Sequence, residues 1–239
     1  MTVDGRGHVR MRTVFDRRSV RGEVLAVAMA GSLLLGATGC AGDEGNDGLP
    51  NDYKVVSGTQ LCGGNAISAD ASRALKVITG SSRFEASSEK YTVAQAATDL
   101  VDVFPTVTVG REDACRIFKP IGTRSFRLRV TWSLENDAPT GPSASKFTVL
   151  KMGERTVAAT EKAYVFFACR SPRLLDSTNV AHIALGVEYW GMPKDPQDNV
   201  EGLKKAYATV AHSYSLAMAK ELRCERNGGL PAKPVLEPA

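Results

Sequence analysis

The sequence predicts an α+β domain, in which an antiparallel sheet of about four to six strands is packed by two or three helices and cross-linked by two disulfides. Strand-like runs follow one another between residues 125 and 190 without helices between them, which favours hairpins over a doubly wound sheet. Amphipathic helical patterns flank this region. Of the 239 residues, 43% are hydrophobic and 23% charged, which suits one globular domain or two small ones and excludes a wholly disordered chain.

The clearest strand is predicted over residues 125–135. Apolar residues from Phe126 to Leu134 alternate there with polar ones, so one face of the strand is expected in the core and the other in solvent. A loop with two prolines follows at 137–145. Further strands of the same sheet are expected over residues 146–152, 156–170 and 180–190.

Two shorter helices are expected before the strands. Ser68 or Asp70 is a candidate N-cap for the first, and Gly80 is its expected end. The second is expected to begin at Thr92 and to stop before Pro105, because proline disfavours helix in the residue that precedes it. Both helices carry an apolar stripe that needs a partner to bury against.

The longest helix is predicted from about Gln197 to Arg223. Its apolar residues follow three-and-four spacing, and Cys224 continues the same row, which places the cysteine sulfur on the buried side. Asn227 and the two glycines after it are expected to end the helix. The remainder, 228–239, is predicted to be a disordered tail.

Residues 1–39 have the three parts of an export signal. A basic stretch ends at Arg21, an apolar stretch runs from Val24 to Leu35, and small residues precede Cys40. From Val24 to the residue before Cys40, the segment would be about 24 Å long as a helix at roughly 1.5 Å per residue, which is short for a bilayer core. A cleaved signal peptide is therefore favoured over a permanent transmembrane anchor.

The segment from Ala37 to Cys40 resembles the lipobox of bacterial lipoproteins, although Ala37 stands where that motif usually has Leu. The resemblance implies that the Cys40 thiol is lipidated, and two acyl chains suffice for stable anchoring at a membrane. An ordinary secretory signal with a coincidental cysteine is the alternative. Residues 40–57 begin with an acidic, glycine-containing spacer and are expected to be a flexible tether, which leaves 58–227 for the globular domain.

The arginines of the leader bear on the export route and on the net charge. Arg17 and Arg18 resemble a twin-arginine signal, but Val20 and Arg21 replace the Phe and Leu expected after them, so the general secretory and twin-arginine routes both stay open. The leader holds six Arg against three acidic residues, whereas the other 200 residues hold 24 basic and 23 acidic ones. The mature chain is nearly neutral, and its charge gives no reason to expect a nucleic-acid partner.

Four cysteines remain beyond the leader and Cys40, and an even number outside the reducing cytoplasm predicts two disulfides. Spacings of 53 and 55 residues favour Cys62 with Cys115 and Cys169 with Cys224 among the three possible pairings. Metal ligation is the rival interpretation, but these cysteines lack metal-ligand spacing, so no metal site is predicted. The two similar loops also leave a pair of pseudo-repeats open, although their residues are poorly alike.

No catalytic residue and no cofactor are predicted. The chain has no G-x-S-x-G elbow and no phosphate-binding glycine loop. His182 lies in a strand-like run and is expected to face solvent. His212 falls on the side of its helix away from the apolar stripe.

Arg124, Arg127 and Arg129 are candidate binding residues. They follow the polar face of the clearest strand, where guanidinium groups would bind an anionic wall polymer or a lipid headgroup. The plainer interpretation is a solvated sheet face with Glu partners on neighbouring strands. Tyr189 and Trp190 stand beside a turn, as residues of a binding rim do, although such aromatic residues more often close the end of a core.

Four features carry a family resemblance: the lipobox-like end at Cys40 with its acidic spacer, and the segments LCGG at 61–64, TGSSRFE at 79–85 and CRSPRL at 169–174. On these, the chain is similar to uncharacterised secreted lipoproteins of actinobacteria. The resemblance implies a place at the extracytoplasmic face of the cell membrane and says nothing about activity.

Two functions follow as hypotheses. The first is a non-enzymatic envelope lipoprotein that is held by its lipid anchor and binds a partner protein, a wall component or a small amphiphile. The second is a secreted hydrolase or an enzyme inhibitor whose site is assembled from separated residues. A deep pocket with two close carboxylates would favour the enzyme, and a protruding rigid loop would favour the inhibitor.

Overall fold

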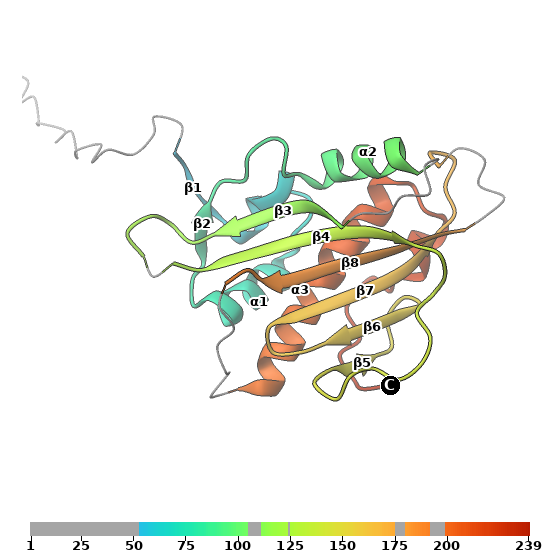
Figure 1. Ribbon diagram of the computed structural model, residues 1–239. Helices are drawn as coiled ribbons and strands as arrows, with labels where there is room; N and C mark the ends of the chain where they lie inside the picture. The colour runs from blue at the N-terminus through green and yellow to red at the C-terminus, as the bar shows by residue number, and fades with distance from the viewer. Residues whose placement is uncertain (1–52, 105–110, 124, 175–179, 192–198) are drawn as a thin grey trace, which may run out of the picture. The chain divides into compact units, whose positions relative to one another are not determined.

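A six-stranded antiparallel sheet carries its helices on one face (Figure 1). The computed structural model describes residues 53–104, 111–123, 125–174, 180–191 and 199–239. The predicted leader, Cys40 and most of the predicted tether lie outside these residues, as does Arg124. The α+β class is confirmed, with an antiparallel sheet, flanking helices and two disulfides.

The sheet has the strand order β3-β4-β8-β7-β6-β5, and every neighbouring pair is antiparallel. A separate two-stranded sheet pairs β1 with β2. The strands of the larger sheet are β3 (Glu112–Phe118), β4 (Arg127–Glu135), β5 (Thr148–Leu150), β6 (Arg155–Ala158), β7 (Lys162–Cys169) and β8 (Ala181–Tyr189), and those of the smaller are β1 (Val55–Ser57) and β2 (Arg83–Glu85).

The alternation of apolar and polar residues over 125–135 corresponds to the two faces of β4. Leu128, Val130 and Trp132 are buried on the face toward the helices, and Arg127 and Arg129 point to the other face. The strand begins two residues later than predicted. The predicted strands at 146–152 and 180–190 correspond to β5 and β8.

The range 156–170 was predicted as one strand, and this is wrong, because the chain turns back within it. β6 and β7 form a hairpin, closed where the Ala159 N–H donates to the carbonyl of Lys162 at 2.8 Å. The connection Ala159–Thr160–Glu161 contains neither glycine nor proline, so no turn signal marks it. β3 was also not predicted, and its register shifts at a β-bulge between Asp113 and Cys115, which interrupts the alternation.

The helices begin where the sequence places capping side chains. Ser68 accepts a hydrogen bond from the Ala71 N–H at 3.2 Å, and Thr92 accepts one from the Gln95 N–H at 3.1 Å. The longest helix is capped by Asn199, whose side chain accepts from the Gly202 N–H at 3.2 Å. The helices are α1 (Ala69–Thr79), α2 (Val93–Val103) and α3 (Val200–Glu221).

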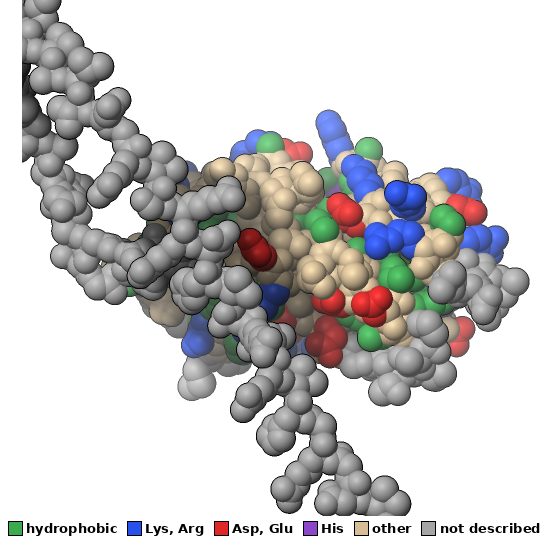
Figure 2. Space-filling view, turned by 90° about the horizontal axis from the view of Figure 1, so that it is seen from above, with side chains coloured by type: hydrophobic (Ala, Val, Ile, Leu, Met, Phe, Trp, Pro, Cys, Tyr) green, Lys and Arg blue, Asp and Glu red, His purple; other side chains and the backbone are tan. Residues whose placement is uncertain are grey.

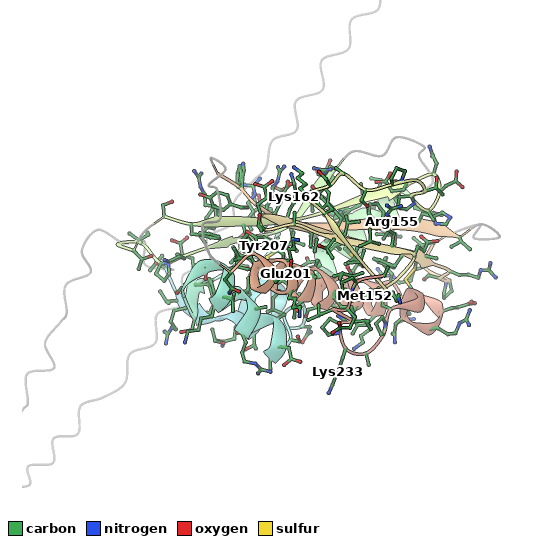
Figure 3. All side chains as sticks on the ribbon, turned by 90° about the horizontal axis from the view of Figure 1, so that it is seen from below. Met152, Arg155, Lys162, Glu201, Tyr207 and Lys233 are labelled. Atoms are coloured by element: carbon green, nitrogen blue, oxygen red, sulfur yellow. A yellow bond between two sulfur atoms is a disulfide. The ribbon has the colours of Figure 1, made fainter. Side chains whose placement is uncertain are left out.

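α3 is the centre of the helical layer. It packs on β6, β7 and β8 and is flanked by α1 and α2. Tyr214 is fully buried, and its hydroxyl donates to the carbonyl of Ala114 in β3 at 3.2 Å. Figure 3 shows the two layers edge-on, with Tyr207 between them, Arg155 and Lys162 on the sheet side and Lys233 on the far helical side. The core therefore lies between one face of the sheet and α3.

Both disulfides join the pairs that the spacing favoured. Cys62 in the 3-10 helix η1 (Gly58–Gly63) bonds Cys115 of β3, with Cα atoms 5.7 Å apart. Cys169 at the end of β7 bonds Cys224, which follows α3, with Cα atoms 4.9 Å apart. Each bond ties the helical layer or its connections to the sheet.

The predicted disordered tail, 228–239, is wrong, because these residues pack against the domain. Leu230 is buried, and the Ala239 N–H donates to the carbonyl of Val149 in β5 at 2.9 Å. Near its middle, the Val235 N–H lies 3.1 Å from the sulfur of Met152. The segment is rich in proline, but Leu230 is buried and Leu236 packs partly buried against the core, and this apolar burial outweighs the expectation from composition.

The predicted tether, 40–57, is too long at its C-terminal end. Val55–Ser57 form β1 and pair with β2, which carries the fully buried Phe84. Residues 40–52 of the predicted tether lie outside the described part of the chain. The predicted start of the domain at residue 58 is therefore corrected to include β1.

His212 is buried, although the sequence placed it away from the apolar stripe of its helix. The C-terminal segment covers that side of α3, and His212 Nε2 lies 2.8 Å from the carbonyl oxygen of Pro231. Because a carbonyl only accepts, Nε2 carries the hydrogen and donates it. Burial lowers the pKa of His212, and the hydrogen bond to Pro231 partly offsets this.

We expect the free energy of unfolding to fall as the pH drops through about 6.5, because the unfolded His212 then binds a proton that the folded one resists. The loss from this group has an upper limit of about 1.4 kcal/mol per pH unit. Chemical denaturation of the wild type and of His212→Gln between pH 7.5 and 5.5 measures it. The variant should show the shallower dependence, and equal slopes would contradict a role for His212.

Candidate ligand-binding face of the sheet

The sheet face that points away from α3, here called the outer face, gathers side chains of four strands. The antiparallel register places Arg129 opposite Glu188, and places Gly186 between Thr131 and Tyr164. Because side chains alternate between the two faces of a strand, all of these lie on one side. The outer face on β3, β4, β8 and β7 includes Arg116, Arg127, Arg129, Thr131, Ser133, Glu135, His182, Ala184, Gly186, Glu188, Lys162, Tyr164 and Phe166.

Three guanidinium groups surround one indole ring on this face. The backbone N–H of Trp190 donates to the carbonyl of Arg127 at 2.9 Å, which extends the β4–β8 ladder by one residue and holds the backbone from which the ring projects. The ring centroid lies 5.2 Å from the guanidinium carbon of Arg116, 5.6 Å from that of Arg127 and 5.9 Å from that of Arg129. These distances suit cation–π attraction. Trp190 remains 37% exposed. We call this group the arginine–tryptophan cluster.

Arg116 is held between two aromatic rings. Its guanidinium carbon lies 4.7 Å from the ring centroid of Tyr91, and Trp190 is the second ring. Its Nε donates to Asp113 at 2.8 Å. Arg116 is therefore held in place by the two rings, and the carboxylate of Asp113 balances its charge.

Glu188 is the carboxylate at the centre of the outer face, and its side chain is 12% exposed. Arg129 donates to it through two nitrogens at 2.5 and 2.6 Å, and the Tyr164 hydroxyl donates at 3.2 Å. Arg111 lies 3.9 Å from it. Burial, and next the charge of Glu188, raise the pKa of Tyr164. Tyr164 therefore stays a neutral hydrogen-bond donor at physiological pH.

A groove of about 240 Å³ runs beside this carboxylate, and we call it the outer groove. Ala184 and Gly186 of β8 form its floor, because small residues there leave the neighbouring strands' side chains standing above them. A Cβ on Gly186 would lie 2.7 Å from Tyr164 Cε1, so no larger residue fits the present arrangement. One wall holds Tyr164 and Phe166, the other holds Thr131, Ser133 and Glu135, and Arg111 also lines the groove.

The structure brings only some of the candidate binding residues named from the sequence together. Arg127, Arg129 and Trp190 meet in the arginine–tryptophan cluster, whereas Arg124 lies outside the described residues. Tyr189 faces the core side and packs on Phe126 with ring centroids 4.9 Å apart, as in the plainer interpretation of a residue that closes a core.

The expectation of Glu partners for the arginines is right for Arg129, which pairs with Glu188. Arg127 is exposed and has no carboxylate within 4 Å among the residues that the structure describes. It is therefore the guanidinium with the most free hydrogen-bonding capacity in the cluster.

Sequence reasoning missed Arg111, Arg116, Tyr91 and Tyr164 as members of the site. Arg111 and Arg116 belong to the region of the unpredicted strand β3, so their face could not be assigned. Tyr164 lies in a recognised strand run, but only the pairing of β7 with β8 brings it next to Glu188. The signals available in the sequence were the polar face of β4 and the aromatic residues beside the turn after β8.

A second hollow, of about 320 Å³, lies beside the Cys169–Cys224 bond. On the face that Figure 2 shows, a group of Lys and Arg side chains lies toward the end away from β1 and β2. The lining of this hollow, however, mixes Arg170 and Arg226 with Glu154 and Glu225, so its formal charge is balanced. Glu154 also lies 2.9 Å from His182 Nδ1.

The described residues hold no group of three or more His, Cys, Asp or Glu side chains placed to bind a metal ion. None of the helices in the same part of the chain has the length and apolar character needed to cross a bilayer.

Removing the arginine that neutralises Glu188 should destabilise the fold. We expect Arg129→Met to lower the free energy of unfolding by about 2 kcal/mol, because it leaves a mostly buried carboxylate with weaker partners. Arg127→Met, on an exposed neighbour, should change it by less than about 0.5 kcal/mol. Urea denaturation measures both, and Glu188→Gln added to Arg129→Met should restore part of the loss. Equal effects of the two Arg variants would contradict the role given to Arg129.

Comparison of the chain with protein-family models, with curated proteins and with solved structures finds no match.

Proposed function

We propose that the protein is an extracytoplasmic lipoprotein, cleaved before Cys40 and held at the cell membrane by acyl chains on that residue. There it binds a component of the envelope through the outer face of its sheet and catalyses no reaction. The two disulfides support export, because such bonds persist in oxidising compartments.

The observation that carries the binding role is the arginine–tryptophan cluster beside the outer groove. Exposed aromatic rings and arginines are enriched in binding surfaces, and here Trp190 and Arg127 are both accessible. The ladder hydrogen bond of Trp190 and the stacking of Arg116 hold the cluster in place before a ligand arrives. A rigid surface loses less conformational entropy on binding than a mobile one.

Mass spectrometry of the membrane-extracted protein tests the anchor. The expected result is a mature chain that begins at Cys40 and carries the added mass of a diacylglyceryl group. Recovery of the intact Met1 leader on protein with reduced cysteines would overturn the proposal.

Photo-crosslinking in cells tests the binding face. A photoreactive p-benzoyl-phenylalanine in place of Glu135, at the outer groove, should capture an envelope component. The same side chain in place of Val77, which is 50% exposed on α1, is the matched control and should capture less. Equal capture from both positions would contradict an outer-face site. Hydrolysis of a wall substrate that is abolished by one side-chain change would favour an enzyme instead.

A further inference from the structure

We infer that the ligand of the outer face is an acidic polysaccharide whose sugar rings carry carboxylates, an inference that rests on the proposed binding function of this face. Three properties of the face support it: a surplus of guanidinium groups, aromatic surfaces next to them, and a groove with hydroxyl groups along one wall.

The charge of the face favours an anion. The guanidinium groups of Arg111, Arg116, Arg127 and Arg129 stand on or beside it with the carboxylates of Asp113, Glu135 and Glu188. Asp113 and Glu188 engage Arg116 and Arg129 at hydrogen-bonding distance. Arg127 has no carboxylate partner within the described part of the chain, and Arg111, with half of its side chain exposed, lies 3.9 Å from Glu188 and over the ring of Tyr164. Guanidinium groups bind carboxylates through two parallel hydrogen bonds. The free capacity therefore lies at Arg127 and Arg111.

The aromatic surfaces favour a ring close to that anion. Trp190 lies within 6 Å of the guanidinium carbon of Arg127, and Tyr164 lies 5.7 Å from that of Arg111. The C–H groups on one face of a sugar ring pack against the electron-rich face of an aromatic ring. A uronic acid carries its ring and its carboxylate in one unit, whereas a glycerol phosphate polymer has no ring to place against Trp190.

The outer groove favours a ligand with many hydroxyl groups. Thr131 and Ser133 line one wall and Phe166 lines the other, so one side offers hydrogen bonds and the opposite side offers apolar contact. Glu135 also lines the groove, and its carboxylate accepts from Ser133 at 2.8 Å. Glu135 would accept from sugar hydroxyls, while Arg111 attracts the carboxylate. A chain of sugar units that carries both hydroxyl groups and carboxylates matches this arrangement.

Isothermal titration of the full-length protein, in a detergent without sugar headgroups, tests the inference. The probe is trigalacturonic acid, and its methyl ester is the matched control because it keeps the rings and removes the charges. We expect the acid to bind about tenfold more tightly than the ester, and we expect added salt to weaken the binding. Trp190→Phe should remove the change in tryptophan fluorescence that accompanies binding.

Two variants separate the outer face from general charge attraction. Arg127→Gln should weaken binding of trigalacturonic acid about tenfold, because it removes a charged donor from the face. Lys233→Gln removes the same charge on the far helical side (Figure 3) and should change the affinity by less than about twofold. Both positions are exposed, so neither substitution should disturb folding.

The inference is overturned if the ester binds as tightly as the acid, if a glycerol phosphate trimer binds more tightly than both, or if the two variants lose affinity equally. Absence of any binding at millimolar concentration would also overturn it. Crosslinks from position 135 that persist in that case would leave the proposed binding function in place and refute only the ligand class. Loss of those crosslinks as well would refute both.

Discussion

Replacing Cys169 and Cys224 together by alanine should lower the free energy of unfolding by about 4 kcal/mol. In the chain-entropy model, the bond restricts the unfolded chain, and the effect grows with the length of the closed loop. The separation of 55 residues sets this magnitude. The bond also holds the end of β7 to the segment after α3, so its loss should free the whole C-terminal segment. Denaturation with guanidinium, followed by circular dichroism, measures the change.

The Cys62–Cys115 pair provides the internal comparison. Its separation of 53 residues is nearly the same, so the model predicts nearly the same loss when both cysteines are replaced by alanine. A reducing agent should destabilise either double variant further, since each keeps one disulfide. A loss below about 1 kcal/mol for either pair would contradict the account for that bond.

Phe167→Ala should also lower the free energy of unfolding by about 4 kcal/mol. The Phe167 side chain is fully buried on the core face of β7, and truncation of such a ring removes apolar contacts and leaves a cavity. Its ring lies so close to Gly228 that a Cβ there would come within 2.6 Å of it. The surroundings therefore fit the ring closely. Equilibrium unfolding in urea gives the difference from the wild type.

Phe166→Ala is the matched control, because the adjacent residue carries the same side chain on the outer face. Phe166 is only partly buried, so its truncation should cost much less than that of Phe167. It should weaken ligand binding at the outer groove instead. Equal losses of stability for the two variants would show that the core does not lie on the helical side alone.

The features that could be predicted from the sequence are those with a local signal. Alternation over 125–135 gives both faces of β4, and Ser68 and Thr92 mark helix starts because a capping side chain acts within three residues of itself. The cysteine spacing favoured the observed pairs but left the other two connectivities open. The hairpin between β6 and β7 has no such signal, because ordinary residues at 159–161 make its turn.

The errors at the two ends of the domain have a common cause. Val55–Ser57 and the residues after Leu230 are ordered by partners that are distant in sequence, namely β2, β5 and α3. Composition describes only what a segment can bury by itself. His212 illustrates this, since its burial depends on Pro231 and not on the pattern of its own helix.

The candidate site was predictable only in part for the same reason. The polar face of β4 supplied Arg127 and Arg129, and the turn after β8 supplied Trp190. The strand order β3-β4-β8-β7 then brings Arg116 and Tyr164 to them, and strand order is not visible in local periodicity. The prediction of a binding component in the envelope stays a prediction.

The position of the last residues has a consequence for self-association. β5 is an edge strand, and an edge with unpaired N–H and C=O groups is a template on which a second molecule can add a strand. Leu150 forms a bridge with Pro238, and the Val149 carbonyl is taken by Ala239. A proline cannot donate to a ladder, so the added segment does not itself offer a regular new edge. The chain thus uses residues 238 and 239 to cover the β5 edge, which hinders a second copy from extending the sheet on that side.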